Sequence, residues 1–302
     1  MLHRGRLVWF DRYGSEMKPV GAEGDYTDFR LSPDDKRLAA SLVDAKTGNP
    51  EIWLTDFDRG ATSRFTLGRP FNASPLWSPD GSRIVFRTTR NGVTEFYQKS
   101  ASLGGTEESV MSVEAQKAVG ALAVSSVPTD WSRDGRYLIF STSVPDLWLL
   151  PGPGESPNPA VSPRKFLASA AQACFSPQGG LIAYSSNEGG AYQVYVQTVP
   201  LSNRKWPVST DGGYEPRWRA DGRELYFLSE DRKLMSVEVN PGPSFGMPKA
   251  LFQTKVSPGV DWLRIHYAPT RDGRRFLINT ETGDTGSNPI TVVLNWTALL
   301  RN

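Results

Sequence analysis

Short apolar segments recur along the whole chain in a fixed order, and the fourth recurrence shows the order clearly. Leu181–Tyr184 has no polar position, which is typical of a strand covered on both faces. Gln193–Gln197 follows with apolar and polar residues in alternation, which indicates a further strand. Lys205–Val208 comes last and predicts an outer edge strand, where Pro207 is tolerated because an edge strand can spare a hydrogen-bond donor.

A turn signal precedes each fully apolar segment. It consists of an aromatic or apolar residue, then Ser-Pro-Asp-Gly or a variant of it, then Arg or another polar residue, then the apolar run. Six such units occur, and they are centred on Asp34, Asp80, Asp134, Gln178, Asp221 and Asp272. The spacings of 46, 54, 44, 43 and 51 residues match one four-stranded propeller blade. The repeat therefore predicts an all-β, six-bladed propeller of four-stranded antiparallel blades.

The residues of the unit are those that a tight hairpin needs. Pro presets φ, Asp can accept a hydrogen bond from the backbone two residues further on, and Gly supplies a positive φ. Two units depart from the pattern, since Asp35 stands where Gly is expected and Gln178 stands where Asp is expected. Other turn residues can serve at both positions, so we expect these hairpins to form.

The chain contains no convincing helix. Residues 107–119 are rich in Glu, Gln, Lys and Ala, and they predict an inserted loop or a short helix in the longest repeat. Residues 151–159 contain four prolines and two glycines and indicate a surface loop.

The Ser-Pro-Asp-Gly units resemble the WD40-like PD40 repeats of TolB-type propellers, and the resemblance covers nearly the whole chain. Residues 289–297, with Asp272–Asn279 before them, resemble the C-terminal end of bacterial proteins that join a serine/threonine kinase or a DNA-binding regulator to such a propeller. In those proteins the propeller is usually a sensor or interaction module. The resemblance implies the same kind of role here, in an extracytoplasmic or periplasmic location, with a cytoplasmic one left open.

The N-terminal segment fits the middle of a blade. Leu7–Asp11 has the pattern of a third strand, and no Asp-Gly hairpin precedes it. We therefore expect a single domain over residues 1–302, in which residues 1–20 form a strand pair that closes the last blade, or a chain that is the end of a longer protein. Closure would pair Leu7–Phe10 in the same sheet as residues 290–294 and hide an open sheet edge.

Composition excludes several classes of function. A net charge of +2 argues against a dedicated nucleic-acid binder. No apolar run reaches the length of a membrane span, and the N-terminus has no signal-peptide pattern. The single cysteine, Cys174, permits no internal disulfide and favours a buried, inert thiol.

Catalytic motifs are missing as well. There is no Gly-x-Ser-x-Gly elbow and no kinase motif, so neither hydrolase nor kinase chemistry is predicted. His3 is terminal, and His266 is interpreted as a packing or mouth-lining residue. Asp56–Gly60 lacks the full ligand set of a calcium loop and predicts a turn. We predict no catalytic residue, no metal site and no cofactor. The aromatic residues that precede the hairpins, among them Trp77, Trp131 and Trp218, are interpreted as a packing layer.

The loops that enter each first strand are the predicted binding site. They differ from blade to blade and combine aromatic faces with hydrogen-bonding groups, which suits the mouth of a channel. An equally open alternative is a set of ordinary loop residues. The candidates are Tyr26, Thr27, Asn72, Thr129, Gln172, Tyr214, Glu215 and Arg264, of which Tyr214, Glu215 and Arg264 are preferred.

The leading hypothesis is a non-catalytic sensor or binding module for a protein or peptide partner, with a small polar ligand as a further option. The alternative is an accessory propeller of a peptidase-type hydrolase that gates access of the substrate. A free-standing enzyme is the third reading. The chain is expected to bind no nucleic acid and to insert into no membrane.

Overall fold

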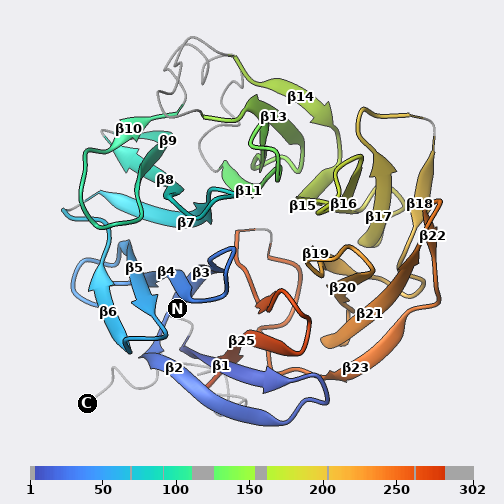
Figure 1. The fold of residues 1–302 in the computed structure, drawn as a ribbon, viewed down its shortest axis with the longest axis horizontal. Helices are drawn as coiled ribbons and strands as arrows, with labels where there is room; N and C mark the ends of the chain where they lie inside the picture. The colour runs from blue at the N-terminus through green and yellow to red at the C-terminus, as the bar shows by residue number, and fades with distance from the viewer. Residues whose placement is uncertain are drawn as a thin grey trace, which may run out of the picture.

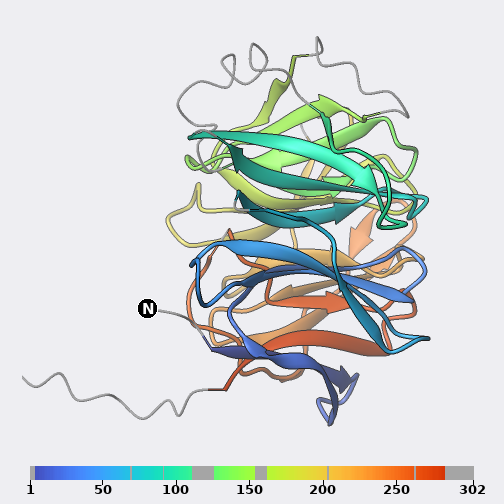
Figure 2. The ribbon, with the colours of Figure 1, turned by 90° about the vertical axis from the view of Figure 1, so that its left-hand side faces the viewer.

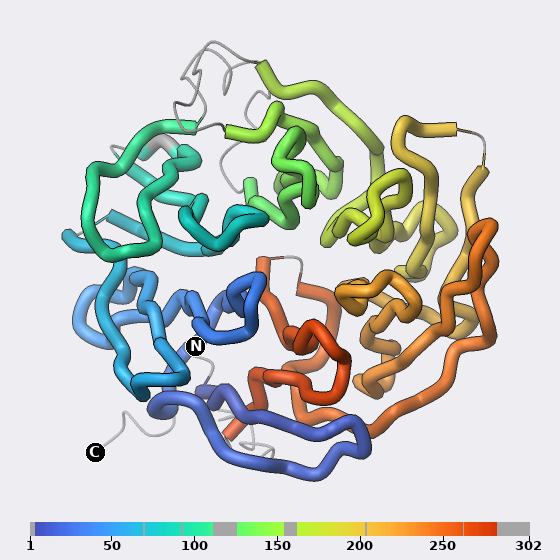
Figure 3. The backbone as a smooth tube through the Cα atoms, viewed as in Figure 1, coloured from blue at the N-terminus to red at the C-terminus, as the bar shows by residue number. Residues whose placement is uncertain are grey.

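Six antiparallel sheets stand around a central axis in the computed structural model of the chain (Figures 1 and 3). The structure describes residues 4–68, 70–90, 92–110, 126–153, 162–202, 204–261 and 263–282. In these ranges it contains strands and turns but no helix, and therefore no helix long and apolar enough to cross a membrane. The predicted six-bladed propeller is confirmed.

The first three blades follow one another in chain order, each starting with its innermost strand. Blade 1 consists of β3 (Tyr26–Leu31), β4 (Arg37–Val43), β5 (Pro50–Asp56) and β6 (Ala61–Arg64). Blade 2 consists of β7 (Phe71–Trp77), β8 (Arg83–Arg90), β9 (Val93–Ser100) and β10 (Glu108–Ser109). Blade 3 consists of β11 (Val127–Trp131), β12 (Tyr137–Ser141), β13 (Leu147–Pro151) and β14 (Arg164–Leu167).

The last three blades complete the ring. Blade 4 consists of β15 (Ala170–Phe175), β16 (Leu181–Ser186), β17 (Gln193–Thr198) and β18 (Lys205–Pro207). Blade 5 consists of β19 (Tyr214–Trp218), β20 (Glu224–Leu228), β21 (Lys233–Asn240), β22 (Ser244–Phe245) and β23 (Lys249–Gln253), with β22 and β23 both paired to β21. Blade 6 consists of β24 (Tyr267–Pro269), β25 (Arg275–Glu281), β1 (Gly5–Asp11) and β2 (Glu16–Gly24).

The repeated turn joins the first and second strands of every blade. In the second unit, Asp80 accepts hydrogen bonds from Ser78 Oγ at 2.5 Å and from the backbone N–H of Ser82 at 3.0 Å. These bonds to the ionised carboxylate lower the pKa of Asp80 to about 2. Gly81 has a φ of 70°, and Asp35 adopts a φ of 59° at the equivalent position of the first unit. Asp can enter this left-handed region, so the first hairpin forms without glycine.

The second strand of each blade is buried because its two faces contact two different neighbours. On β8, Ile84 and Phe86 pack in the cluster shared with blade 1, whereas Val85 packs in the cluster shared with blade 3. The same division holds around the ring, which contains six such inter-blade clusters within the described residues. A side chain on each face of a radial sheet therefore needs an apolar partner, and this explains the nearly continuous apolar runs.

The two ends of the described chain meet in blade 6. β1 pairs with β25 without a register shift, from Gly5 opposite Glu281 to Asp11 opposite Arg275, and Figure 2 shows both strands together at one side of the ring. Beyond β1, the Arg12 side chain donates hydrogen bonds to Tyr226 Oη and to Glu224 of blade 5. This contact fixes the turn after β1 to the neighbouring blade.

Three of the expectations concern residues outside the described ranges. The proposed pairing partner at residues 290–294 is among them, so its relation to Leu7–Phe10 stays a prediction. Most of the segment 107–119 is also outside, although its first residues contribute the short strand β10. The Pro/Gly segment 151–159 is described only to residue 153.

Candidate functional site

The central channel has two ends that differ in how the chain forms them. At the crossover end, the fourth strand of one blade leads into the first strand of the next, and this is the predicted binding face. At the hairpin end, the Ser-Pro-Asp-Gly turns join first and second strands. The innermost strands run from the crossover end to the hairpin end.

The structure places most of the predicted binding residues inside the protein rather than on a rim. Arg264 is partly exposed, with 19% of its side chain accessible. The other six are at most 6% exposed, and they are Tyr26, Asn72, Thr129, Gln172, Tyr214 and Glu215. Thr27, the remaining candidate, is half-buried.

The buried candidates belong to a set of hydrogen bonds between blades. Each innermost strand from β3 to β19 has a bulge, and the bulge residue donates its backbone N–H to a serine of the preceding blade in three places. These bonds run from Ser74 to Ser41 Oγ at 3.1 Å, from Gln172 to Ser141 Oγ at 3.3 Å and from Glu215 to Ser185 Oγ at 3.0 Å. The three bulge residues share a positive φ, which is 55° at Ser74, 54° at Gln172 and 57° at Glu215. Their backbone is therefore used for assembly of the ring.

Glu215 continues this set of bonds into blade 6. Its carboxylate lies 2.8 Å from Nδ1 of His266 and also accepts the backbone N–H of His266 at 3.1 Å. Its carbonyl accepts the hydroxyl of Tyr267 at 2.8 Å, and Arg217 lies 3.5 Å from the carboxylate. Glu215 is fully buried, so this geometry supports the interpretation of His266 as a packing residue.

The preferred candidates are thus separated by role. Tyr214 packs edge-on against His266, with 6.0 Å between ring centres, in the same interior group as Glu215. Arg264 pairs instead with Asp25 at 2.8 Å and ties the connection between blades 5 and 6 to blade 1. The structure brings together Gln172, Tyr214 and Glu215, but it does not bring Arg264 or Asn72 to them.

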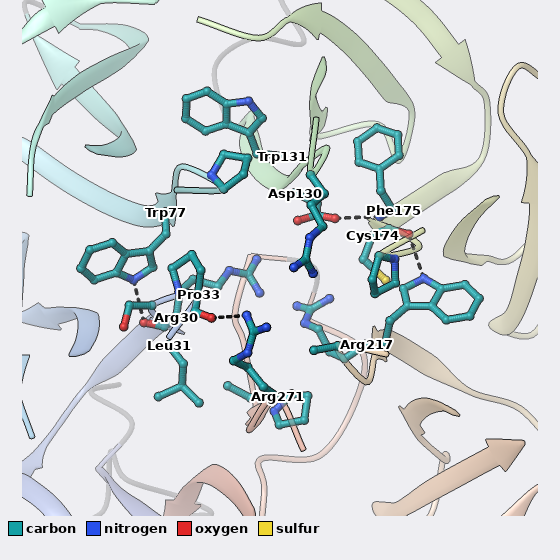
Figure 4. A pocket seen from close by; sticks show the side chains of 18 of the residues that line it. Arg30, Leu31, Pro33, Trp77, Asp130, Trp131, Cys174, Phe175, Arg217 and Arg271 are labelled. Atoms are coloured by element: carbon teal, nitrogen blue, oxygen red, sulfur yellow. Dashed lines mark hydrogen bonds between the residues drawn. The ribbon is translucent and has the colours of Figure 1, made fainter. Parts of the chain in front are cut away.

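The hairpin end holds a cavity of about 310 Å³ on the axis of the ring (Figure 4). All six blades line it, and they do so with three equivalent positions of the repeat. The outer position, here called the rim, is occupied by Pro33, Pro79, Arg133, Pro177, Ala220 and Arg271. The middle position, the collar, is occupied by Leu31, Trp77, Trp131, Phe175, Trp218 and Pro269. The inner position, the floor, is occupied by Arg30, Leu76, Asp130, Cys174, Arg217 and Ala268.

The collar is the aromatic position of the repeat. Trp77 and Trp131 are at most 6% exposed, and the indole N–H of each donates to a backbone carbonyl, of Arg30 and of Gly135 respectively, at 3.1 Å. The rings therefore pack between blades, in agreement with the packing interpretation, while their edges line the cavity.

The floor carries charge on alternate blades. Arg30 extends from blade 1, Asp130 from blade 3 and Arg217 from blade 5, and small or apolar residues lie between them (Figure 4). Asp130 accepts the backbone N–H of Phe175 at 2.7 Å, and burial raises the pKa of its carboxyl to about 6. Arg217 donates to the carbonyl of Pro216 at 2.8 Å.

Arg30 is the least satisfied of the three. Within the described residues its side chain makes one hydrogen bond, from Nη2 to the carbonyl of Thr129 at 3.2 Å, and its Nε has no partner. Burial and the nearby Arg217 guanidinium both lower the pKa of Arg30. It forms no ion pair with a described residue, although the carboxylates of Asp28, Glu215 and Asp130 attract it from a greater distance. Arg30 is half-buried at the cavity, and its unused donors are available to a ligand there.

Cys174 lies in the same floor but offers little reactivity. Burial raises the pKa of its thiol to about 12, and its sulfur lies 3.1 Å from the carbonyl of Pro216. The thiol stays protonated at neutral pH, which agrees with the predicted inert cysteine. No group of His, Cys, Asp and Glu among the described residues is arranged to hold a metal ion.

A second, larger groove lies at the outside of the same face. It has a volume of about 990 Å³ and lies between blades 4 and 5. Its buried carboxylate, Glu224, is already bound by Arg12, by Arg219 Nη1 at 2.9 Å and by Tyr226 Oη at 2.8 Å. This buried charge is satisfied by the protein itself, whereas the axial cavity holds an arginine with unused donors, so the axial cavity is the better candidate for a binding site.

The rim residues carry a pattern in the sequence that would have pointed to this end of the channel. Three of its six residues are the proline of the repeat, whereas Arg133 and Arg271 replace that proline in blades 3 and 6. The floor residue, which directly precedes the collar residue in the sequence, also differs from blade to blade. Variation within an otherwise regular repeat would have indicated the hairpin end as the specific surface.

The comparisons with known proteins agree with the fold. A family model described as the TolB beta propeller domain, PD40, matches residues 16–146. A solved structure assigned as a TolB from Agrobacterium tumefaciens is 17% identical, with a TM-score of 0.66, and the match covers 93% of this chain and 99% of that one. TolB from Acinetobacter baumannii is also 17% identical, with a TM-score of 0.58, over 93% of this chain and 65% of that one.

Enzymes occur among the structural relatives too. A puromycin-hydrolyzing peptidase from Mycobacterium tuberculosis is 14% identical with a TM-score of 0.60, and the match covers 86% of this chain but 44% of the peptidase. Likeness at this level shows the fold alone. The chain therefore has a propeller fold similar to that of TolB, and residues 16–146 match the family model of the TolB beta propeller domain. The extracytoplasmic location stays a prediction from the resemblance.

Proposed function

We propose that this chain is a non-catalytic module that binds a segment of a partner protein at the hairpin end of its channel. The observation that carries the proposal is Arg30, a half-buried arginine that faces the axial cavity with unused donors and no ion pair among the described residues. A site of this kind is consistent with binding, since the polar groups of binding pockets are few and are placed for a ligand.

The walls of the cavity support a chain segment as the ligand. The rim has three prolines in rigid turns, and the collar below it has four aromatic residues. Rigid apolar walls reduce the entropy lost on binding and give a peptide side chain a surface to pack against. Recognition would then come from the charged floor.

A peptide library displayed on phage tests the proposal directly. Peptides selected on the wild-type protein should lose at least about tenfold in affinity for Ala220→Trp, because Ala220 lines the cavity and an indole there would fill it. The matched control is Ala61→Trp, which places the same side chain on the exposed strand β6.

Two results would overturn the proposal. Selected peptides that bind Ala220→Trp as tightly as the wild type would locate binding elsewhere on the surface. A selection that enriches no peptide over uncoated support would argue against recognition of chain segments.

A further inference from the structure

We infer that the floor of the cavity binds a carboxylate group, carried either by an acidic side chain or by the C-terminus of the partner segment. The inference rests on the proposed function and adds the chemistry of the ligand. It follows from the positions of Arg30 and Arg217, from the small residue on the blade between them, and from the fact that the nearby carboxylates already have partners in the protein.

The two arginines leave room for an anion between them. They lie on blades 1 and 5, and blade 6 separates these two in the ring. The floor residue of blade 6 is Ala268, whose side chain is a single methyl group. The guanidinium groups are near enough for Arg217 to lower the pKa of Arg30. An anion placed between two like charges would relieve this repulsion.

The carboxylates near the site are already bound by other groups of the protein. Asp130 is held by the backbone N–H of Phe175, and its raised pKa shows that burial disfavours its charge more than the arginines favour it. Glu215 is engaged with His266 and lies 3.5 Å from one nitrogen of Arg217. The free donors of Arg30 therefore remain for a ligand.

The orientation of Arg30 suits a carboxylate. Its Nη2 is fixed by the carbonyl of Thr129, so the guanidinium is positioned before a ligand arrives. A planar carboxylate can accept two parallel hydrogen bonds from such a group, and these charge-assisted bonds are short and strong. A neutral or cationic ligand would leave the arginine donors buried and unpaired, which costs affinity.

Ala268→Asp tests the inference without any ligand, because it builds a carboxylate into the proposed site. We expect the melting temperature of Ala268→Asp at pH 7 to exceed that of the isosteric Ala268→Asn by about 2 °C or more. The difference should disappear when both variants also carry Arg30→Gln. An Ala268→Asp variant that melts at or below Ala268→Asn would overturn the inference, as would a difference that survives Arg30→Gln.

Three N-acetylated hexapeptides identify the source of the carboxylate. The first is Gly-Ser-Ala-Gly-Ser-Ala with a free C-terminus, the second is its amide with aspartate at the third position, and the third is the neutral amide. Fluorescence polarisation, with fluorescein on the N-terminus of each peptide in place of the acetyl group, should show at least about tenfold tighter binding of the first or the second than of the neutral peptide. Tighter binding of the first peptide would identify a C-terminus as the ligand, and tighter binding of the second would identify an acidic side chain.

Matched variants complete the experiment. Arg30→Gln and Ala268→Asp should remove the preference for carboxylate, whereas Arg274→Gln should keep it, because Arg274 is an exposed arginine of the blade 6 hairpin outside the cavity. Equal binding of all three peptides, or no binding of any, would overturn the inference. The proposed function would still stand if library-selected peptides remained sensitive to Ala220→Trp.

Discussion

The two ends of the channel use polar residues in opposite ways. At the crossover end, Gln172, Glu215 and His266 are buried and mostly bonded to one another or to the backbone of the next blade. At the hairpin end, Arg30 faces the cavity and forms no ion pair with a described residue. Polar residues at the crossover end hold blades together, whereas Arg30 at the hairpin end keeps donors available to a ligand.

The difference arises from the bulge in the innermost strands. A bulge turns one residue out of the ladder, and its N–H then needs an acceptor outside the sheet. Serines on the preceding blade supply that acceptor, as Ser185 does for Glu215 at 3.0 Å. Between the bulge and the hairpin the strands are regular, so their inward side chains are free to vary with the ligand.

The largest effect is expected from Glu215→Ala at the crossover end. The change leaves Arg217 and His266 without their buried partner, so we expect the free energy of unfolding to fall by about 3–5 kcal/mol. Urea denaturation followed by tryptophan fluorescence measures it. A loss below about 1 kcal/mol would mean that the crossover end is not the more structural of the two.

The next effect depends on pH and concerns Asp28, a crossover-end residue whose oxygens have no hydrogen-bond partner. Burial, together with the nearby charge of Glu215, raises the pKa of its carboxyl to about 6, against the charges of Arg30 and Arg217, which lower it. The folded state then holds its proton more tightly than the unfolded state. The stability from this group is therefore present below about pH 4 and is lost as the pH rises through 6.

Asp28→Asn removes this titration and keeps the shape of the side chain. Relative to the wild type we expect the variant to gain up to about 3 kcal/mol of unfolding free energy between pH 4 and pH 7. Urea denaturation at several pH values within this interval gives the slope. A parallel pH profile of the two proteins would show that Asp28 titrates normally.

Ser185→Ala should have a smaller effect. It removes an acceptor of the Glu215 N–H, which also reaches Gln172 Oε1 at 2.9 Å, so one of two bonds remains. We expect a loss of about 1 kcal/mol in urea denaturation. Ser102→Ala, an exposed serine at the outer side of blade 2, is the control and should change stability by less than about 0.5 kcal/mol.

The smallest effect on stability is expected from Arg30→Gln at the hairpin end. Arg30 has no ion pair among the described residues, so its removal should change the free energy of unfolding by no more than about 0.5 kcal/mol, or raise it. The same variant is expected to lose binding of carboxylate peptides. A stability loss as large as that of Glu215→Ala would remove the contrast between the two ends.

The sequence by itself determined the fold of this protein. Six turns, five with Asp and one with Gln178 at the centre, are spaced by the length of a blade and required hairpins. The apolar runs after them required sheets on both sides. These are local properties, because a hairpin depends on the φ preferences and side-chain bonds of four or five neighbouring residues. Even the departure at Asp35 could be interpreted correctly on these grounds.

The tertiary structure alone decided which residues face the channel freely. Glu215 and Arg217 are two positions apart on one strand, yet the first is tied to His266, 51 residues away, and the second lines the cavity. Their roles differ because a bulge places one of them against the next blade. No pattern within a single blade records which partner a neighbouring blade will supply, since that contact forms only when the ring closes.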